Sequence, residues 1–127
     1  MKPWTLLGLA TLALTACQST PHGTETVELT VTRVVVPQHV GASDDLPVVI
    51  TVTLGGCQTF KGFAVQERTA STLKLLAQGT SPSGKNVVCP AIIGSAEKTY
   101  IDPGSPARTS PFEVFVNGQS YGSVGVE

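Results

Sequence analysis

The segment that decides the fold class reads Phe112-Glu113-Val114-Phe115-Val116-Asn117-Gly118-Gln119-Ser120-Tyr121. Apolar and polar residues alternate on both sides of Asn117-Gly118, the residue pair that most favours a two-residue β-hairpin turn because both turn positions need positive φ. We therefore predict a β-hairpin with its turn at these two residues. In a regular hairpin Phe112, Val114 and Tyr121 share one face, and Val124 and Val126 would point to the opposite face. A β-bulge near Gly122 would return these two valines to the core.

Outward from this hairpin, the chain from residue 27 onward repeats short alternating segments separated by turn residues. No window has the apolar spacing of an amphipathic helix. Asp102-Pro103-Gly104 fits a type II turn. About seven to eight short strands in a chain of this size indicate an all-β fold, an antiparallel two-sheet sandwich of immunoglobulin-like architecture, with a small closed β-barrel as the alternative. The other segments predicted as strands are 27–32, 34–36, 47–54, 60–68, 72–78, 87–89, 91–93 and 98–101.

The start of the chain has the three-part form of an export signal. Lys2 supplies a basic start, an apolar segment runs from Trp4 to Leu14, and small residues follow. This apolar segment is shorter than the roughly 20 helical residues that a bilayer span requires. We therefore predict that residues 1–16 are a leader and not a permanent anchor.

The end of this leader, Leu14-Thr15-Ala16-Cys17, resembles the lipobox of bacterial lipoproteins. The resemblance implies that a diacylglyceryl group is attached to Cys17, that the leader is cut before this residue, and that the new amino group is acylated. Such a protein is held at a membrane of the cell envelope, with its domain facing the periplasm or the cell exterior. Two or more acyl chains give stable anchoring, at about 0.8 kcal/mol per buried methylene. An ordinary secretory leader followed by an incidental cysteine is the alternative.

The lipobox divides the rest of the chain into a tether and a domain. Residues 17–26 contain Pro21 and Gly23 and show no helical or strand periodicity, so we expect a lipidated N-terminus and a flexible tether. Residues 27–127 are then the β-sandwich domain, and their number suits one domain.

The cysteine count depends on the same resemblance. Three cysteines in an exported chain leave one without a partner. If lipidation consumes Cys17, we expect Cys57 and Cys89 to form a disulfide in an oxidising compartment. A pair of buried free thiols is the alternative.

The charge distribution argues against nucleic acid as a partner. Removal of the leader takes Lys2 away, so 7 of the 8 Lys and Arg residues remain against 9 Asp and Glu residues. No basic stripe is present to neutralise phosphates. There is also no polybasic segment for anionic lipid, so the acyl chains are expected to supply the membrane affinity.

Candidates for metal binding or catalysis are weak. His22, His39, Cys57 and Cys89 contain none of the closely spaced pairs that build zinc sites, so we predict no metal and no cofactor. Asp44-Asp45 is interpreted as a solvated turn. We predict no catalytic residues and no enzyme activity, with a hydrolase in which His39 meets an acid and a nucleophile as an alternative.

Partner binding is the function that remains. Phe115 lies on the strand face opposite Phe112, and an exposed aromatic near a sheet edge can anchor a partner, as could Phe60. Cover by side chains of the same sheet is the alternative for these rings. We predict a non-catalytic binding or structural module with an envelope protein as its partner. An inhibitor of lysozyme or protease, inserting a loop such as 81–85 or 102–108 into an enzyme, or a small-ligand-binding protein, is the alternative.

Overall fold

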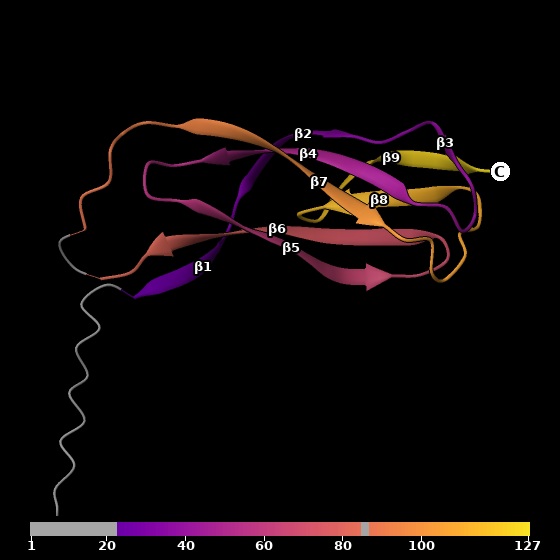
Figure 1. Cartoon of the computed structure of the whole chain (residues 1–127), viewed down its shortest axis with the longest axis horizontal. Coiled ribbons are helices and arrows are strands. Elements are labelled where there is room, and N and C mark those ends of the chain that lie inside the picture. The colour runs from indigo at the N-terminus through magenta and orange to yellow at the C-terminus, as the bar shows by residue number, and fades with distance from the viewer. Residues whose placement is uncertain (1–22, 85–86) are drawn as a thin grey trace, which may run out of the picture.

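The computed structural model describes residues 23–84 and 87–127. The predicted leader 1–16, Cys17 and His22 lie outside these ranges. Within them the chain forms nine strands and no helix, and hence no helix long and apolar enough to cross a membrane. The strands are β1 (Thr24–Glu28), β2 (Thr30–Val35), β3 (His39–Val40), β4 (Leu46–Leu54), β5 (Thr59–Arg68), β6 (Thr72–Pro82), β7 (Gly94–Asp102), β8 (Phe112–Val116) and β9 (Gln119–Val126) (Figure 1).

The strands form two open sheets that pack as a β-sandwich. One sheet has three strands in the order β2-β4-β7, and the other has six. In the larger sheet β5 lies along one edge of β6, while β1 and β8 share the other edge. This follows because Gln78 of β6 pairs with β1 and β5, whereas Leu73 pairs with β5 and β8. The two-sheet prediction is confirmed. Two pairings, β6 with β8 and β3 with β9, are parallel, which alternation alone does not specify.

The hairpin with its turn at Asn117-Gly118 forms as predicted. Asn117 and Gly118 have φ values of 52° and 78°, as a type I′ turn requires. The pairing of β8 with β9 shifts register near Gly122, whose φ is 113°. This bulge turns Val124 into the core, where it is fully buried, and leaves Val126 packed against the core.

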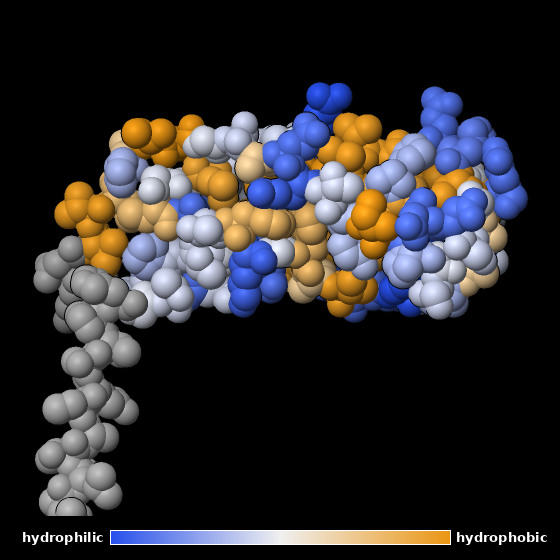
Figure 2. All heavy atoms as spheres, in the orientation of Figure 1, coloured by the Kyte–Doolittle hydropathy of each residue, from blue (hydrophilic) through white to orange (hydrophobic). Residues whose placement is uncertain are grey.

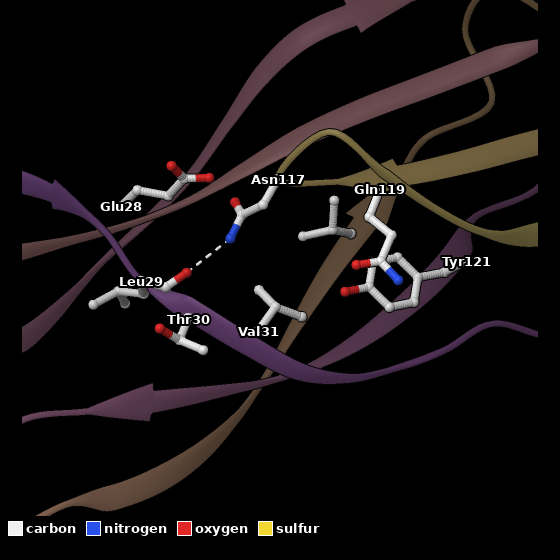
Figure 3. Close-up of a pocket in the computed structure, with 8 residues that line it drawn as sticks. Glu28, Leu29, Thr30, Val31, Asn117, Gln119 and Tyr121 are labelled. Carbon is white, nitrogen blue, oxygen red and sulfur yellow. Dashed lines mark hydrogen bonds between the residues drawn. The ribbon is translucent and has the colours of Figure 1, made fainter.

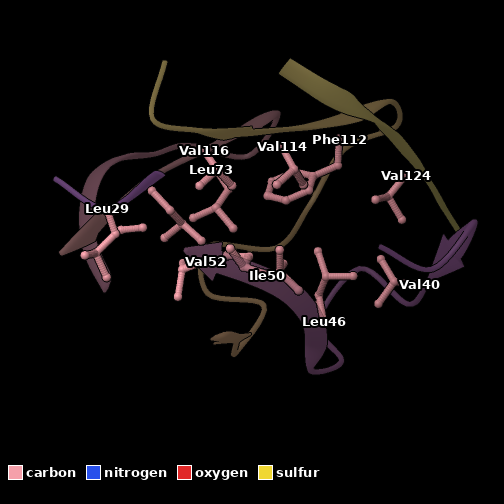
Figure 4. Close-up of a cluster of buried hydrophobic side chains, with 13 residues drawn as sticks. Leu29, Val40, Leu46, Ile50, Val52, Leu73, Phe112, Val114, Val116 and Val124 are labelled. Atoms are coloured by element: carbon pink, nitrogen blue, oxygen red, sulfur yellow. The ribbon is translucent and has the colours of Figure 1, made fainter. Parts of the chain in front are cut away.

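The core fills the space between the two sheets (Figure 4). Side chains alternate along a strand, so every second residue of a sandwich strand points inward. The predicted inward faces of 47–54 and 72–78 are therefore the buried faces of β4 and β6. The fully buried side chains of β4, β6 and β8 are Leu46, Val48, Ile50, Val52, Leu73, Leu75, Ala77, Phe112, Val114 and Val116.

The alternating segment 27–32 is divided between the two sheets. Leu29, which is 1% exposed, separates β1 from β2, and its N–H donates a hydrogen bond to the Ala77 carbonyl at 2.9 Å. Strand β1 pairs with β6 in the larger sheet, whereas β2 pairs with β4 in the smaller one. Strand β1 also begins at Thr24, ahead of the predicted domain start at residue 27, because Thr24 pairs with Pro82.

The predicted strands 87–89 and 91–93 are wrong. Both segments belong to the irregular β6–β7 connection, since β6 ends at Pro82 and β7 begins at Gly94. Pro90 supplies no ladder hydrogen bond. Cys89 is drawn away from both sheets by its disulfide to Cys57, with a Cα–Cα distance of 5.4 Å. The predicted disulfide is therefore confirmed.

The sandwich is elongated, and its strands run between two ends (Figure 1). The start of β1, the β4–β5 turn and the β6–β7 connection lie at one end, which we call the N-terminal end. The β5–β6 turn, the β7–β8 connection and residue 127 lie at the other, which we call the C-terminal end.

Candidate functional site

Three charged side chains meet at the C-terminal end of the sandwich. Asp102 ends β7, Arg68 ends β5 and Arg108 lies in the β7–β8 connection. Asp102 and Arg108 are 1% and 3% exposed. The Asp102 carboxylate accepts hydrogen bonds from Arg68 Nε at 2.8 Å and Nη2 at 3.0 Å, and from Arg108 Nη2 at 2.6 Å and Nε at 3.1 Å. One carboxylate therefore holds two guanidinium groups.

The remaining donors of Arg108 bind backbone carbonyls of the β3–β4 turn and of the end of β7. Its Nη1 donates to the carbonyls of Gly41 at 2.9 Å and Asp44 at 2.7 Å, and its Nη2 donates to the carbonyl of Asp102 at 2.8 Å. Both guanidinium groups also stack on the ring of Phe112 in the core, with Arg108 Cζ 5.4 Å from the ring centroid. No buried side-chain nitrogen or oxygen in the described part of the chain lacks a hydrogen-bond partner.

Electrostatics favours the ionised form of the Asp102 carboxyl. Burial disfavours the charged carboxylate and by itself raises the pKa of Asp102, but the hydrogen bonds and positive charges of Arg68 and Arg108 outweigh burial and hold the pKa below its ordinary value. Nearby, burial and then the Asp102 charge raise the pKa of Tyr100, while the Arg68 charge opposes them.

The cluster fixes one exposed loop, residues 103–107, which we call the pinned loop. Arg68 Nη2 donates to the Pro106 carbonyl at 2.9 Å, and the Arg108 N–H donates to the Ala42 carbonyl at 2.9 Å. Gly104 has a φ of 75°, and a Cβ there would lie 2.6 Å from the Ser43 carbonyl carbon, so the loop packs directly on the neighbouring backbone. The side chains of residues 105–107 remain exposed.

Sequence reasoning proposed 81–85 or 102–108 as a loop able to insert into an enzyme, but it placed Asp102 in an ordinary turn. The first loop is wrong in its first two residues, because Ser81 and Pro82 end β6 and pair with β1, and Lys85 lies outside the described residues. The signal available was an aspartate followed six residues later by Arg108. The second partner, Arg68, lies 34 residues away in sequence and reaches Asp102 only when β5 and β7 have assembled.

A second surface is a groove of about 280 Å³ where the chain passes from β1 to β2. Asn117 at the hairpin turn bridges its two walls, because its Nδ2 donates to the Leu29 carbonyl at 2.7 Å (Figure 3). The lining of this groove is mostly polar, with carboxylate, hydroxyl, amide and phenol groups around two valines. Such a lining suits the binding of a short polar peptide segment or a small polar molecule. The lining residues are Glu28, Leu29, Thr30, Val31, Val116, Asn117, Gln119 and Tyr121.

The two phenylalanines predicted as partner contacts are not brought together. Phe115 lies on β8 and Phe60 on β5, with β6 between these strands. Phe115 is half-buried and has Lys74 Nζ 5.2 Å from its ring centroid, which is cover from its own sheet. Phe60 packs edge to face on Phe63 at 5.2 Å. Their contact with a partner stays a prediction.

The other residues weighed in the sequence lie at the C-terminal end. His39 is exposed in β3, opposite Gly125 of β9. Asp44 and Asp45 are exposed in the turn before β4, as interpreted. Across residues 23–84 and 87–127 no three His, Cys, Asp or Glu side chains form a group that could hold a metal ion.

Fold and site together define a disulfide-bonded β-sandwich that carries a preorganised surface loop at one end. Comparisons with protein-family models, curated proteins and solved structures found no match for this chain.

Proposed function

We propose that this protein is a lipid-anchored, non-catalytic binding module of the bacterial cell envelope, and that it contacts a protein partner through the pinned loop. One observation carries the proposal: Asp102 and Arg108, the buried charged side chains of the described residues, are used to fix that loop. A buried ion cluster adds little net stability, but it defines geometry. A loop already ordered in the free protein loses less entropy when it binds.

The lipobox supports the anchoring part of this proposal. A lipid on Cys17 holds the start of the domain at the membrane, and β1 begins at the N-terminal end of the sandwich (Figure 1). The pinned loop lies at the opposite end. It is therefore available to a partner in the periplasm or outside the cell.

The same loop favours inhibition of an envelope or secreted hydrolase as a second function. Its exposed residues, Ser105-Pro106-Ala107, are small and held on a rigid support, as entry into an enzyme cleft requires. Inhibition assays with lysozymes and secreted proteases test this function, and the absence of inhibition would remove it. Binding of a small ligand would instead use the groove beside Asn117.

A photo-crosslinking amino acid at Ala107 tests the binding surface in the full chain in its own cells. We expect an adduct of defined mass at this position and none with the crosslinker at Glu97, an exposed residue of β7. A crosslinker at Phe115 tests the contact predicted there. Equal adducts at Ala107 and Glu97, or none at either, would contradict binding through the pinned loop.

The anchor is tested by Cys17→Ala. We expect this variant to lose both palmitate labelling and cleavage of the leader, because the sulfur is the acylated atom. Ser19→Ala, just outside the lipobox, is the matched control and should keep both. A lipid label and an unchanged cleavage site in Cys17→Ala would show that the anchoring proposal is wrong.

A further inference from the structure

The β6–β7 connection exposes three large apolar side chains at the N-terminal end. Val88, Ile92 and Ile93, which we call the apolar tip, are 90%, 71% and 73% exposed, whereas every other large hydrophobic side chain in the described residues is at most 48% exposed. Figure 2 shows apolar atoms gathered at this end of the molecule. Exposed apolar clusters of this kind mark sites of contact with proteins or membranes.

The tip is held outward by covalent and packing contacts. The Cys57–Cys89 disulfide ties the connection to the β4–β5 turn. A Cβ on Gly56 would lie 2.1 Å from the Pro90 carbonyl oxygen, so the two backbones are in direct contact. The apolar side chains beside Cys89 and Pro90 therefore cannot fold back into the core without breaking this support.

The surroundings of the tip suit hydrocarbon better than a protein surface. Residues 54–60 and 87–96, which form the β4–β5 turn, the second part of the connection and their flanks, contain no charged residue, whereas Lys85 precedes Val87 by two residues in the same connection. Insertion of residues 87–93 themselves therefore takes no charge out of water, which is the main cost of entering lipid. Protein interfaces, in contrast, surround an apolar centre with a polar rim that forms hydrogen bonds.

The start of the described chain lies beside this connection. The Ser83 N–H donates a hydrogen bond to the Gly23 carbonyl at 2.7 Å. Ser83 itself precedes Val87 by four residues in the same connection. Cys17 precedes Gly23 by six residues, which span at most about 20 Å. A headgroup layer is about 5 to 8 Å thick, so this length lets the tip reach the acyl chains and keeps it close to them. A lipid on Cys17 would also make insertion intramolecular, which favours even a weak contact.

We propose that the apolar tip inserts into the outer part of the bilayer that holds Cys17. The insertion stands the sandwich upright, with its long axis away from the membrane and the pinned loop at the far end. This inference rests on the proposed lipid attachment for the closeness of the membrane, and on the exposure and composition of the tip for the contact itself.

A single tryptophan at Ile92 tests the insertion in the full chain. Trp4→Phe is included in each variant, so that the introduced tryptophan is the only one whether or not the leader is cut. The protein is reconstituted in phosphatidylcholine vesicles with or without bromine on the acyl chains. We expect bromine to lower the emission of Ile92→Trp about two-fold, because interfacial apolar residues reach the outer acyl region. Val35→Trp, an exposed position on β2 near the C-terminal end, is the matched control and should not be quenched.

The outcomes separate this inference from the proposed anchor. A lipid on Cys17 without quenching of Ile92→Trp overturns tip insertion and leaves the anchor standing. Quenching of Ile92→Trp in a protein without lipid on Cys17 contradicts the anchor and supports insertion. A blue-shifted Ile92→Trp emission in the vesicles that bromine on the acyl chains does not quench means that protein covers the tip, and overturns the inference.

Discussion

Asn117 meets two structural demands with one side chain. It adopts the positive φ of the hairpin turn. Its side-chain amide also forms a hydrogen bond at the edge of β6, where the neighbouring strand changes from β8 to β1. Ala77 lies between the β8-paired and β1-paired halves of this edge. Its N–H donates to Asn117 Oδ1 at 2.9 Å, and its carbonyl accepts the Leu29 N–H. The turn preference could be predicted from the sequence, whereas this bridge depends on strands far apart in the chain.

Asn117→Gly tests the bridge without disturbing the turn, because glycine also suits a type I′ turn. The substitution leaves the Ala77 N–H and the Leu29 carbonyl without these partners, so we expect a loss of about 1 to 3 kcal/mol in the free energy of unfolding. Urea denaturation measures this loss. Gln119→Ser, an exposed neighbour, should change stability by less than about 0.5 kcal/mol. Equal midpoints for Asn117→Gly and the wild type would refute the bridge.

Asp102 gives the protein an acid-sensitive contribution to stability. The pKa of Asp102 in the folded state lies below its unfolded value of about 3.9. The stabilisation is therefore complete above the unfolded pKa and is lost as the pH falls through the folded pKa. We expect the wild type to lose stability between about pH 5 and pH 2, and Asp102→Asn to lose less over this range.

At neutral pH, Asp102→Asn should cost about 3 to 5 kcal/mol, because two guanidinium groups lose their carboxylate. Asp45→Asn removes a carboxylate from an exposed turn and should cost less than about 0.5 kcal/mol. Urea unfolding across this pH range measures both effects. A parallel pH dependence in Asp102→Asn and the wild type would show that another group carries the acid sensitivity.

At the scale of elements, alternation reports which face of a strand is buried, but not which strand it pairs with. Strands β4, β6 and β8 could be predicted because their inward residues face one core, whereas in β5 only Phe60 and Phe63 pack against it and Val65 is exposed. The division at Leu29 could not, since Val27, Leu29 and Val31 share one parity and read as one strand. The error at 87–93 has a related cause. Its apolar residues resemble a buried strand, but the disulfide and Pro90 hold them in an exposed connection.

The β-bulge in β9 offers a test of local backbone conformation. Gly122 has a φ of 113° and no atoms within 4 Å of an added Cβ, so Gly122→Ala changes conformational strain without a clash. We expect a loss of about 1 to 3 kcal/mol in stability. Gly94→Ala, also in open space but without a positive φ, is the matched control. Equal thermal midpoints for the two variants would contradict the strain.

At the scale of the whole molecule, the two candidate contacts lie at opposite ends of one rigid sandwich. Sequence reasoning predicted the anchor residue, the disulfide and the loop 102–108, all of which depend on local motifs or cysteine counting. It missed the apolar tip because Ile92 and Ile93 were assigned to a short strand interrupted at Pro90. Only the assembled fold places the start of the β6–β7 connection beside Gly23 and the pinned loop at the far end.

Under the proposed lipid anchor and tip insertion, the length of the tether sets how strongly the membrane contact is favoured. Insertion of 12 Gly and Ser residues between Ser19 and Thr20 should lower the local concentration of the tip at the bilayer about five-fold, because effective concentration falls with the 3/2 power of linker length. Quenching of Ile92→Trp by brominated lipid should fall accordingly. Replacement of residues 18–22 by the same number of Gly and Ser residues is the control. Unchanged quenching with the longer tether would show that the tip binds without help from the anchor.

The passage of the chain from β1 to β2 also determines how the domain carries mechanical load. Strand β1 follows the tether directly and runs along the long axis of the sandwich (Figure 1). Under the proposed anchor on Cys17 and the proposed partner on the pinned loop, a pull between the two acts along β1, against the five residue pairs that it forms with β6. Force in this direction shears those hydrogen bonds together instead of unzipping them singly. Because forced unfolding is governed by the unfolding rate, we expect this arrangement to slow unfolding of the domain under such a pull.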